Sequence, residues 1–126
     1  IQLTIIEAIA KFDKLKPNGI EQTDKIEWLS TCDWNIYRDI IETHEDADEV
    51  TFKGYDESTP LDTVLIAPAP YDEMYVYWLE AQSDYNNGEI GRYNNSISMF
   101  NSVLESFRNK YNSKHKPLQK NKMKYF

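Results

Sequence analysis

Residues 90–111 read IGRYNNSISMFNSVLESFRNKY, and this stretch decides the fold. Its large apolar side chains recur at alternating spacings of three and four residues, which puts them on one face of a helix. Two long helices that pack side by side at a shallow crossing angle need this spacing. The stretch therefore predicts a long helix with a helical partner along its length. Its apolar stripe consists of Ile90, Tyr93, Ile97, Phe100, Leu104, Phe107 and Tyr111.

The predicted partner is the segment directly before it, across the turn signal Asn86-Asn87-Gly88. A short turn of this kind joins antiparallel neighbours, so the third and fourth helices form a long antiparallel helical hairpin. The third helix is expected to begin at Pro70, because proline suits the first helical position. Its predicted core stripe consists of Tyr71, Met74, Trp78, Ala81 and Tyr85, with Val76, Tyr77 and Leu79 on other faces.

Two further helices are predicted upstream of this hairpin. The first begins at a capping box formed by Thr4 and Glu7 and ends before a turn signal in residues 16–19. The second is capped by residues 23–24 and runs to about Thr43. Their core stripes are Ile5, Ala8, Ile9, Phe12 and Leu15 in the first helix, and Ile26, Leu29, Cys32, Ile36 and Ile40 in the second.

Between the second and third helices, β-branched residues predict a small β-hairpin. Residues 50–52 (VTF) and 63–66 (TVLI) are its two strands, and Gly54 with residues 56–60 supplies the turn. The fold class is therefore mainly α, with about four helices, this β-hairpin and an extended C-terminal tail. We divide the chain into a helical domain at residues 1–111 and a basic extended tail at residues 112–126.

The sequence predicts neither catalysis nor a bound cofactor. A hydrolytic triad needs a histidine near a nucleophile and an acid, but His44 lies in an acidic run and His115 lies in the tail. Cys32 is the only cysteine and lies in an apolar stripe, which is typical of a buried, unreactive thiol. The sequence has no phosphate loop, dinucleotide fingerprint or two-histidine metal motif. We therefore expect no enzyme, no metal site and no cofactor.

Charge is divided unevenly along the chain. Residues 1–105 carry seven Lys/Arg and all 21 acids, a formal charge of −14, whereas residues 106–126 carry seven Lys/Arg and no acid, a charge of +7. This asymmetry is typical of an acidic body with a basic tail that binds a partner. Three interpretations of the tail stay open: a docking arm whose apolar anchors are steered by lysines, a solvated tail, or a contact to nucleic acid. The candidate docking residues are Lys114, Lys116, Pro117, Leu118, Lys120, Lys122, Met123, Lys124, Tyr125 and Phe126.

Aromatic residues are in surplus, with nine Tyr, three Trp and five Phe. Tyr and Trp are enriched where proteins meet, because they bury a large area with few rotatable bonds. No apolar run approaches the roughly 20 residues needed to cross a bilayer, so we expect no membrane partner. Apolar side chains that lie off the core stripes are candidates for a subunit interface, namely Trp28, Trp34, Val76, Tyr77, Met99 and Val103.

Six short segments, which together span most of the chain, carry a resemblance to a known family. They are residues 9–13 (IAKFD), 24–29 (DKIEWL), 60–63 (PLDT), 68–73 (PAPYDE), 78–81 (WLEA) and 93–96 (YNNS). In these segments the sequence resembles the small head-tail connector proteins of tailed phages, of the adaptor type that lies beneath the portal ring. None of the segments is a catalytic motif, so the resemblance is one of overall pattern.

The resemblance implies a structural virion protein that forms a ring of about twelve copies under the portal and links the head to the tail. Its implied partners are other copies of itself, the portal protein above, contacted by the C-terminal tail, and a stopper or tail protein below. DNA is expected to pass through the ring without specific binding, and the location is the virion neck, after assembly in the host cytoplasm. Two alternatives stay open: a tail-completion or stopper protein, and a small DNA-binding regulator that uses the basic tail.

Overall fold

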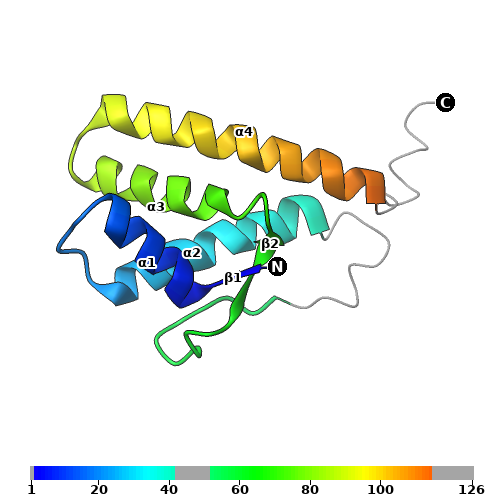
Figure 1. Cartoon of the computed structure of the whole chain (residues 1–126), viewed down its shortest axis with the longest axis horizontal. Helices are drawn as coiled ribbons and strands as arrows, with labels where there is room; N and C mark the ends of the chain where they lie inside the picture. Colours follow the sequence, from blue (N-terminus) through cyan, green and yellow to red (C-terminus); the bar gives the residue numbers. More distant parts are fainter. Residues whose placement is uncertain (1, 42–51, 115–126) are drawn as a thin grey trace.

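The computed structural model describes residues 2–41 and 52–114, and within them four α-helices account for most of the chain (Figure 1). Helix α3 (Glu73–Asn86) lies between α4 (Ile90–Lys114) on one side and α1 (Ile5–Leu15) and α2 (Gln22–Ile36) on the other. Buried residues therefore occur around the whole circumference of α3. The mainly helical fold class predicted from the sequence is confirmed.

Helix α1 begins as predicted, at a capping box. The Thr4 backbone N–H donates to Glu7 Oε1 at 2.9 Å, and the Glu7 N–H donates back to Thr4 Oγ1 at 3.3 Å. These two bonds satisfy backbone donors that have no partner inside the helix. The stripe behind them is buried at every predicted position except Leu15.

Helix α2 differs from the prediction at both ends. It begins at Gln22 with Glu21 as the N-cap, so residues 23–24 lie inside its first turn rather than capping it. After Ile36 the chain continues as a π-helical turn, η1 (Tyr37–Ile41), and Thr43 lies outside the described residues. The predicted stripe from Ile26 to Ile40 is buried throughout, because the π turn keeps Ile40 on the core side.

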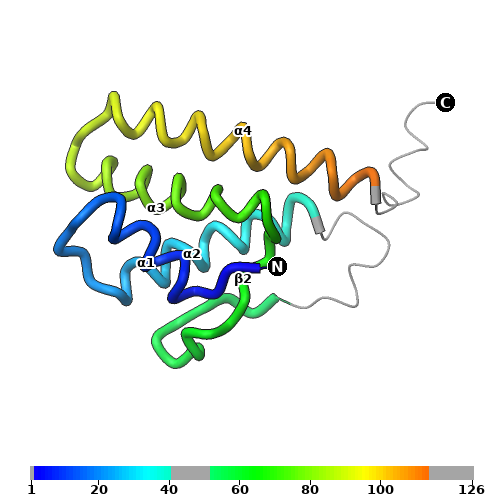
Figure 2. The backbone as a smooth tube through the Cα atoms, viewed as in Figure 1, coloured from blue at the N-terminus to red at the C-terminus, as the bar shows by residue number. Residues whose placement is uncertain are grey.

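The sheet has a different composition from the predicted hairpin. Strand β2 (Val64–Pro68) forms at the predicted place, but its antiparallel partner is β1 (Gln2–Thr4) at the N-terminal end of the chain (Figure 2). Residues 50–51 lie outside the described residues, and Phe52 is not in a strand. Its ring instead packs edge-on against Trp34, with centroids 5.0 Å apart, so burial of the aromatic ring replaces strand pairing there.

Helices α3 and α4 form the predicted antiparallel hairpin. Two aromatic pairs join them, Trp78 to Phe100 with centroids 4.9 Å apart and Tyr85 to Tyr93 at 5.4 Å. A third pair, Tyr71 to Phe107 at 5.6 Å, joins the turn before α3 to α4 and continues the same spacing. Each step of seven residues forward along α3 matches an equal step back along α4, so the register is constant along the hairpin. The turn needs Gly88, whose φ of +74° suits glycine.

The ends of this hairpin correct four predictions. Pro70 lies in the turn before α3, whose first helical residue is Glu73. Tyr85 and Ile90 are exposed rather than buried, because they flank the turn where the neighbouring helices no longer cover them. Helix α4 continues to Lys114, so the boundary predicted at residue 111 falls inside a helix.

A buried carboxylate joins four parts of the chain. Asp33 of α2 accepts hydrogen bonds from the Tyr55 hydroxyl at 2.5 Å, the Tyr75 hydroxyl at 2.6 Å and the Ile66 backbone N–H at 3.2 Å. The Tyr75 hydroxyl also accepts from the Ala67 N–H at 2.8 Å. This network fixes the segment around Tyr55 and strand β2 to the helices.

Candidate docking surface

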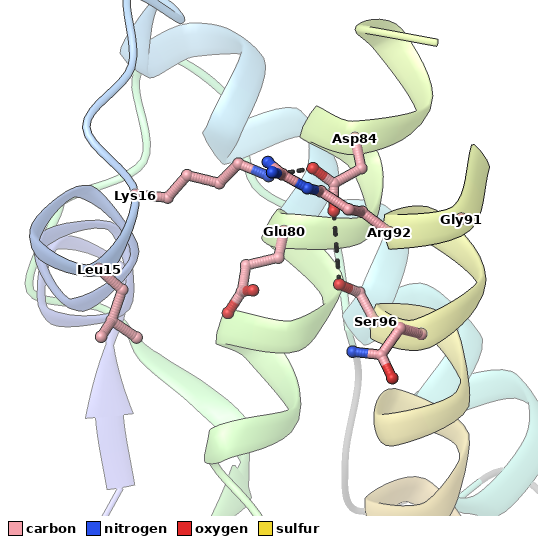
Figure 3. Close-up of a pocket in the computed structure, with 8 residues that line it drawn as sticks. Leu15, Lys16, Glu80, Asp84, Gly91, Arg92 and Ser96 are labelled. Carbon is pink, nitrogen blue, oxygen red and sulfur yellow. Dashed lines mark hydrogen bonds and ion pairs between the residues drawn. The ribbon is translucent and has the colours of Figure 1, made fainter. Parts of the chain in front are cut away.

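Two adjoining hollows lie on the surface between α1, α3 and α4, with volumes of about 450 Å³ and 370 Å³. They share Leu15 and Glu80 as lining residues, so they form one continuous depression, which we call the Leu15 groove. Figure 3 shows the α4 end of it, with Leu15 on α1 facing Glu80 on α3. The groove is lined by Lys11, Lys14, Leu15, Lys16, Glu73, Val76, Tyr77, Glu80, Asp84, Gly91, Arg92, Asn95 and Ser96.

Leu15 is the apolar centre of this groove. It is 69% exposed, although the sequence pattern predicts it in the core. Helix α1 ends at Leu15, and the chain leaves the helix at Lys16, whose N–H still bonds to the Phe12 carbonyl at 2.9 Å. The last turn of the helix therefore presents Leu15 to the surface, where Val76 and Tyr77 of α3 extend the apolar floor.

A buried ion pair closes one end of the groove. The Lys16 ammonium contacts Asp84, whose side chain is almost fully buried, and the Ser96 hydroxyl donates to the other Asp84 oxygen at 3.5 Å. Arg92 of α4 also lines this part of the groove (Figure 3), and its Nη1 lies 3.5 Å from Glu89 Oε1. The pair ties the end of α1 to α3 and keeps Asp84 from being a buried charge without a partner.

The opposite wall of the groove carries an acid with a perturbed pKa. Partial burial raises the pKa of Glu80, the nearby Lys16 opposes that rise, and Asp84 adds to it. A raised carboxyl pKa in a hollow is typical of functional sites, but it also follows from packing alone. Neither a histidine nor a cysteine is among the residues that line this groove.

The groove concentrates positive charge on an acidic body. Of the seven Lys/Arg in residues 1–105, four line it, namely Lys11, Lys14, Lys16 and Arg92. Three acids also line it, so its formal charge is +1, whereas residues 1–105 together carry −14. Such a contrast marks a surface where an acidic partner is attracted.

A separate hollow, of about 420 Å³, is lined by acidic rather than basic side chains. It lies where the start of α2 meets the segment after Gly54, and we call it the acidic hollow. Asp24, Glu27, Asp56 and Glu57 line it together with Thr23 and Tyr55, and no Lys or Arg does. Its carboxylates are not arranged as a metal site, and within residues 2–41 and 52–114 no cluster of His, Cys, Asp and Glu is.

The turn that builds the acidic hollow is held rigidly. The Asp56 carboxylate accepts from the Ser58 N–H at 2.8 Å and from the Ser58 hydroxyl at 2.7 Å. These bonds, with others from Thr59, lower the pKa of Asp56. The Tyr55 hydroxyl donates a hydrogen bond to the buried Asp33, which fixes the tyrosine ring. Asp56 and Tyr55 are therefore held in a preformed arrangement.

The six candidate interface residues are distributed between core and surface. Val76 is buried, and Trp28, Tyr77 and Val103 are half-buried and pack against the core. The Trp28 carbonyl accepts from the Trp78 indole N–H at 2.8 Å, which explains why that part of α2 faces α3. Trp34 and Met99 are 37% and 43% exposed, so these two remain available to a partner. Val76 and Tyr77 line the Leu15 groove.

Of the candidate docking tail, the structure describes only Lys114, the last residue of α4. The other nine tail residues lie outside the described ranges. Sequence reasoning missed the Leu15 groove and the acidic hollow. The available signal was the clustering of Lys11, Lys14 and Lys16 within six residues of an otherwise acidic segment.

Across the helices that the structure describes, none combines the length and apolar character that crossing a membrane requires. No protein-family model matches the sequence, and no curated protein and no solved structure is detectably similar to it. The resemblance to phage connectors therefore rests on the six quoted segments alone.

Proposed function

We propose that this protein is a structural subunit of a phage neck, a head-tail connector of the adaptor type that assembles as a ring beneath the portal. The observation that carries the proposal is the Leu15 groove, an apolar depression rimmed by lysine and arginine on an acidic body. An exposed leucine in a hollow between helices is a docking feature, because its burial by a partner removes apolar surface from water. The six segments that resemble connector proteins supply the particular class.

The division of charge supports the remaining parts of the proposal. A ring of acidic bodies has a channel of negative potential, so DNA moves through it without binding. The basic tail, residues 115–126 together with Lys114, contacts the portal above, and a stopper or tail protein docks below. Apolar residues interleaved with the tail lysines provide anchors, while the lysines speed association. The location that follows is the virion neck, after assembly in the host cytoplasm.

Electron microscopy of the protein mixed with the portal ring from the same genome tests this proposal. Three versions are compared: the full chain, a chain that ends at Lys114, and a chain in which the order of residues 115–126 is scrambled. Because scrambling keeps the charge and composition, it separates specific anchoring from general attraction. We expect a stacked ring from the full chain only.

Two results would contradict the proposal. If the full chain adds no density to the portal ring, the protein is not an adaptor. If instead it binds duplex DNA with an affinity that falls steeply with salt, and loses that binding without residues 115–126, the DNA-binding regulator is the better interpretation. A protein that binds beneath an adaptor ring but not to the portal alone is a stopper.

A further inference from the structure

The Leu15 groove and the acidic hollow have opposite charge and do not share a residue. The Leu15 groove contains four of the seven basic residues of the body, whereas the acidic hollow contains four carboxylates and no base. The groove divides into parts of about 450 and 370 Å³, and the acidic hollow is about 420 Å³. The ion pair of Lys16 with Asp84 holds the end of α1 at the groove, and the hydrogen bond of Tyr55 to Asp33 holds the segment that lines the acidic hollow.

We propose that the Leu15 groove of one copy binds the rim of the acidic hollow of the next copy, and that this head-to-tail contact builds the ring. The occupant of the groove is thus a second copy of this chain. A contact between two different surfaces of identical subunits repeats from copy to copy, and it closes into a ring when the rotation allows. The inference rests on the proposed function, because it names the contact that a connector ring requires.

The charges favour a contact between the groove and the acidic hollow over a contact between two acidic hollows. Two acidic hollows repel each other, and most of the remaining body is acidic as well, since residues 1–105 carry −14. The groove brings Lys11, Lys14, Lys16 and Arg92 together. Lys16 already pairs with Asp84, and Arg92 lies 3.5 Å from Glu89. Lys11 and Lys14 are therefore the main attraction for a carboxylate of the next copy. Like-charge repulsion excludes wrong partners, and opposite charges orient the right one.

The contact also buries apolar surface, which contributes binding free energy in addition to the attraction between charges. Leu15 stands exposed between Lys11 and Lys14 on one side and Lys16 on the other. In the acidic hollow the half-buried ring of Tyr55 lies among the carboxylates. An apolar anchor surrounded by charged residues is the usual arrangement of a protein interface.

Charge reversal on each surface tests the contact with the full-length chain. The groove variant carries Lys11→Glu and Arg92→Glu, and the hollow variant carries Glu27→Lys and Glu57→Lys. All four side chains are exposed, so each variant is expected to fold. Circular dichroism spectra and thermal unfolding check this. Matched controls reverse exposed charges elsewhere, with Arg38→Glu and Lys53→Glu in one control and Asp39→Lys and Asp62→Lys in the other.

Sedimentation velocity over a range of concentrations gives the association of each protein alone and in mixtures. We expect the wild type and both controls to associate, and each reversed variant alone to associate at least about tenfold more weakly. In the groove variant a groove of −3 faces a hollow of −4, and in the hollow variant the charge of −4 that attracts the groove is reduced to 0. An equal mixture of the two reversed variants should regain association. In that mixture the unchanged groove of the hollow variant, with a formal charge of +1, meets the unchanged hollow of the groove variant, with −4, so the wild-type contact forms between the two chains. The other contact places a groove of −3 against a hollow of 0 and has no like-charge repulsion.

The outcomes separate this inference from the proposed function. Association of the hollow variant at the wild-type level, or a mixture that stays as weak as its components, would overturn the head-to-tail contact while leaving a portal-bound ring intact. Loss of association on removal of residues 115–126 would place the tail, not the hollow, in the groove. A wild type that sediments as a monomer at all concentrations would also overturn it, and portal binding then decides the proposed function separately.

Discussion

Raising the pH from 4 to 7 is expected to lower the free energy of unfolding by about 2 kcal/mol relative to the Asp33→Asn variant, because of one buried carboxyl group. Burial raises the pKa of Asp33 from an ordinary value of 3.8 to about 6, although the hydroxyls of Tyr55 and Tyr75 and the Ile66 N–H stabilise the anion. The difference is about two pKa units, and each unit corresponds to about 1.4 kcal/mol, so the full effect is about 3 kcal/mol, of which about 2 kcal/mol falls between pH 4 and pH 7.

The direction follows from which state binds the proton more tightly. Well below pH 3.8 Asp33 is protonated in both the folded and the unfolded chain. Between pH 4 and pH 6 the unfolded chain loses this proton while the folded chain keeps it, so the free energy of unfolding falls as the pH rises. The loss levels off as the pH rises through the folded pKa of about 6, above which both states are ionised. The asparagine side chain of the variant does not titrate, so the variant lacks this dependence.

Comparison with the variant is needed because other carboxylates act in the opposite direction. Hydrogen bonds from Thr4 lower the pKa of Glu7, and bonds from Ser58 lower that of Asp56, so both contribute stability that is lost as the pH falls. These groups are the same in both proteins and cancel in the difference. Urea unfolding at several pH values, followed by circular dichroism, gives the two free energies.

A second measurement removes the dependence on unfolding. The ¹³C chemical shift of the Asp33 carboxyl carbon, followed by NMR, gives its pKa in the folded protein directly. In a Tyr55→Phe variant that pKa should rise further, since the anion loses one donor. A pKa for Asp33 below 4, or a wild type that gains stability relative to Asp33→Asn as the pH rises, would refute the reasoning. The three hydrogen bonds would then outweigh burial.

Three further substitutions test local features of the fold. Replacing Gly54 with Ala should lower the free energy of unfolding by about 1–2 kcal/mol or more. The φ of +86° disfavours a side chain, and the new Cβ would lie 2.8 Å from Trp34 Nε1. An unchanged midpoint of urea unfolding would contradict this. Thr4→Ala should cost about 1 kcal/mol through loss of the N-cap, and Thr4→Ser, which keeps the hydroxyl, serves as the control. Leu15→Ser should change the unfolding free energy by less than about 0.5 kcal/mol but weaken self-association; a large loss of stability would place Leu15 in the core after all.

The sequence pattern was sufficient for the helical hairpin and insufficient for the sheet. Seven apolar residues at strict spacing predict α4 and its partner, and the constant register of the aromatic pairs confirms this. Strand β1 has only three residues, and it pairs with a strand that lies far away in the sequence, beyond α1 and α2. Local propensity carries no information about such a pairing, so the segment nearest in sequence was assigned as the partner instead.

The residues of the candidate site were also predicted only in part. Val76 and Tyr77 were predicted as interface residues because they lie off the core stripe, and both line the Leu15 groove. Leu15 itself was assigned to the core, since a periodic stripe does not reveal where the neighbouring helix stops covering it. The network around Asp33 was not predicted either. An aspartate beside the stripe of α2 looks solvent-exposed until Tyr75 and Tyr55 are brought to it by the fold.

The central position of α3 sets the order in which the molecule opens. Helix α4 packs mainly on α3, whereas α3 also contacts α1 and α2. Separation of α4 leaves those other contacts in place, but displacement of α3 breaks the whole structure. Backbone amides of α4 should therefore exchange with solvent through a partial opening, and those of α3 only through global unfolding. Such an opening exposes Phe100 and Phe107, and a neighbouring copy seated in the Leu15 groove, which bridges α1, α3 and α4, would suppress it.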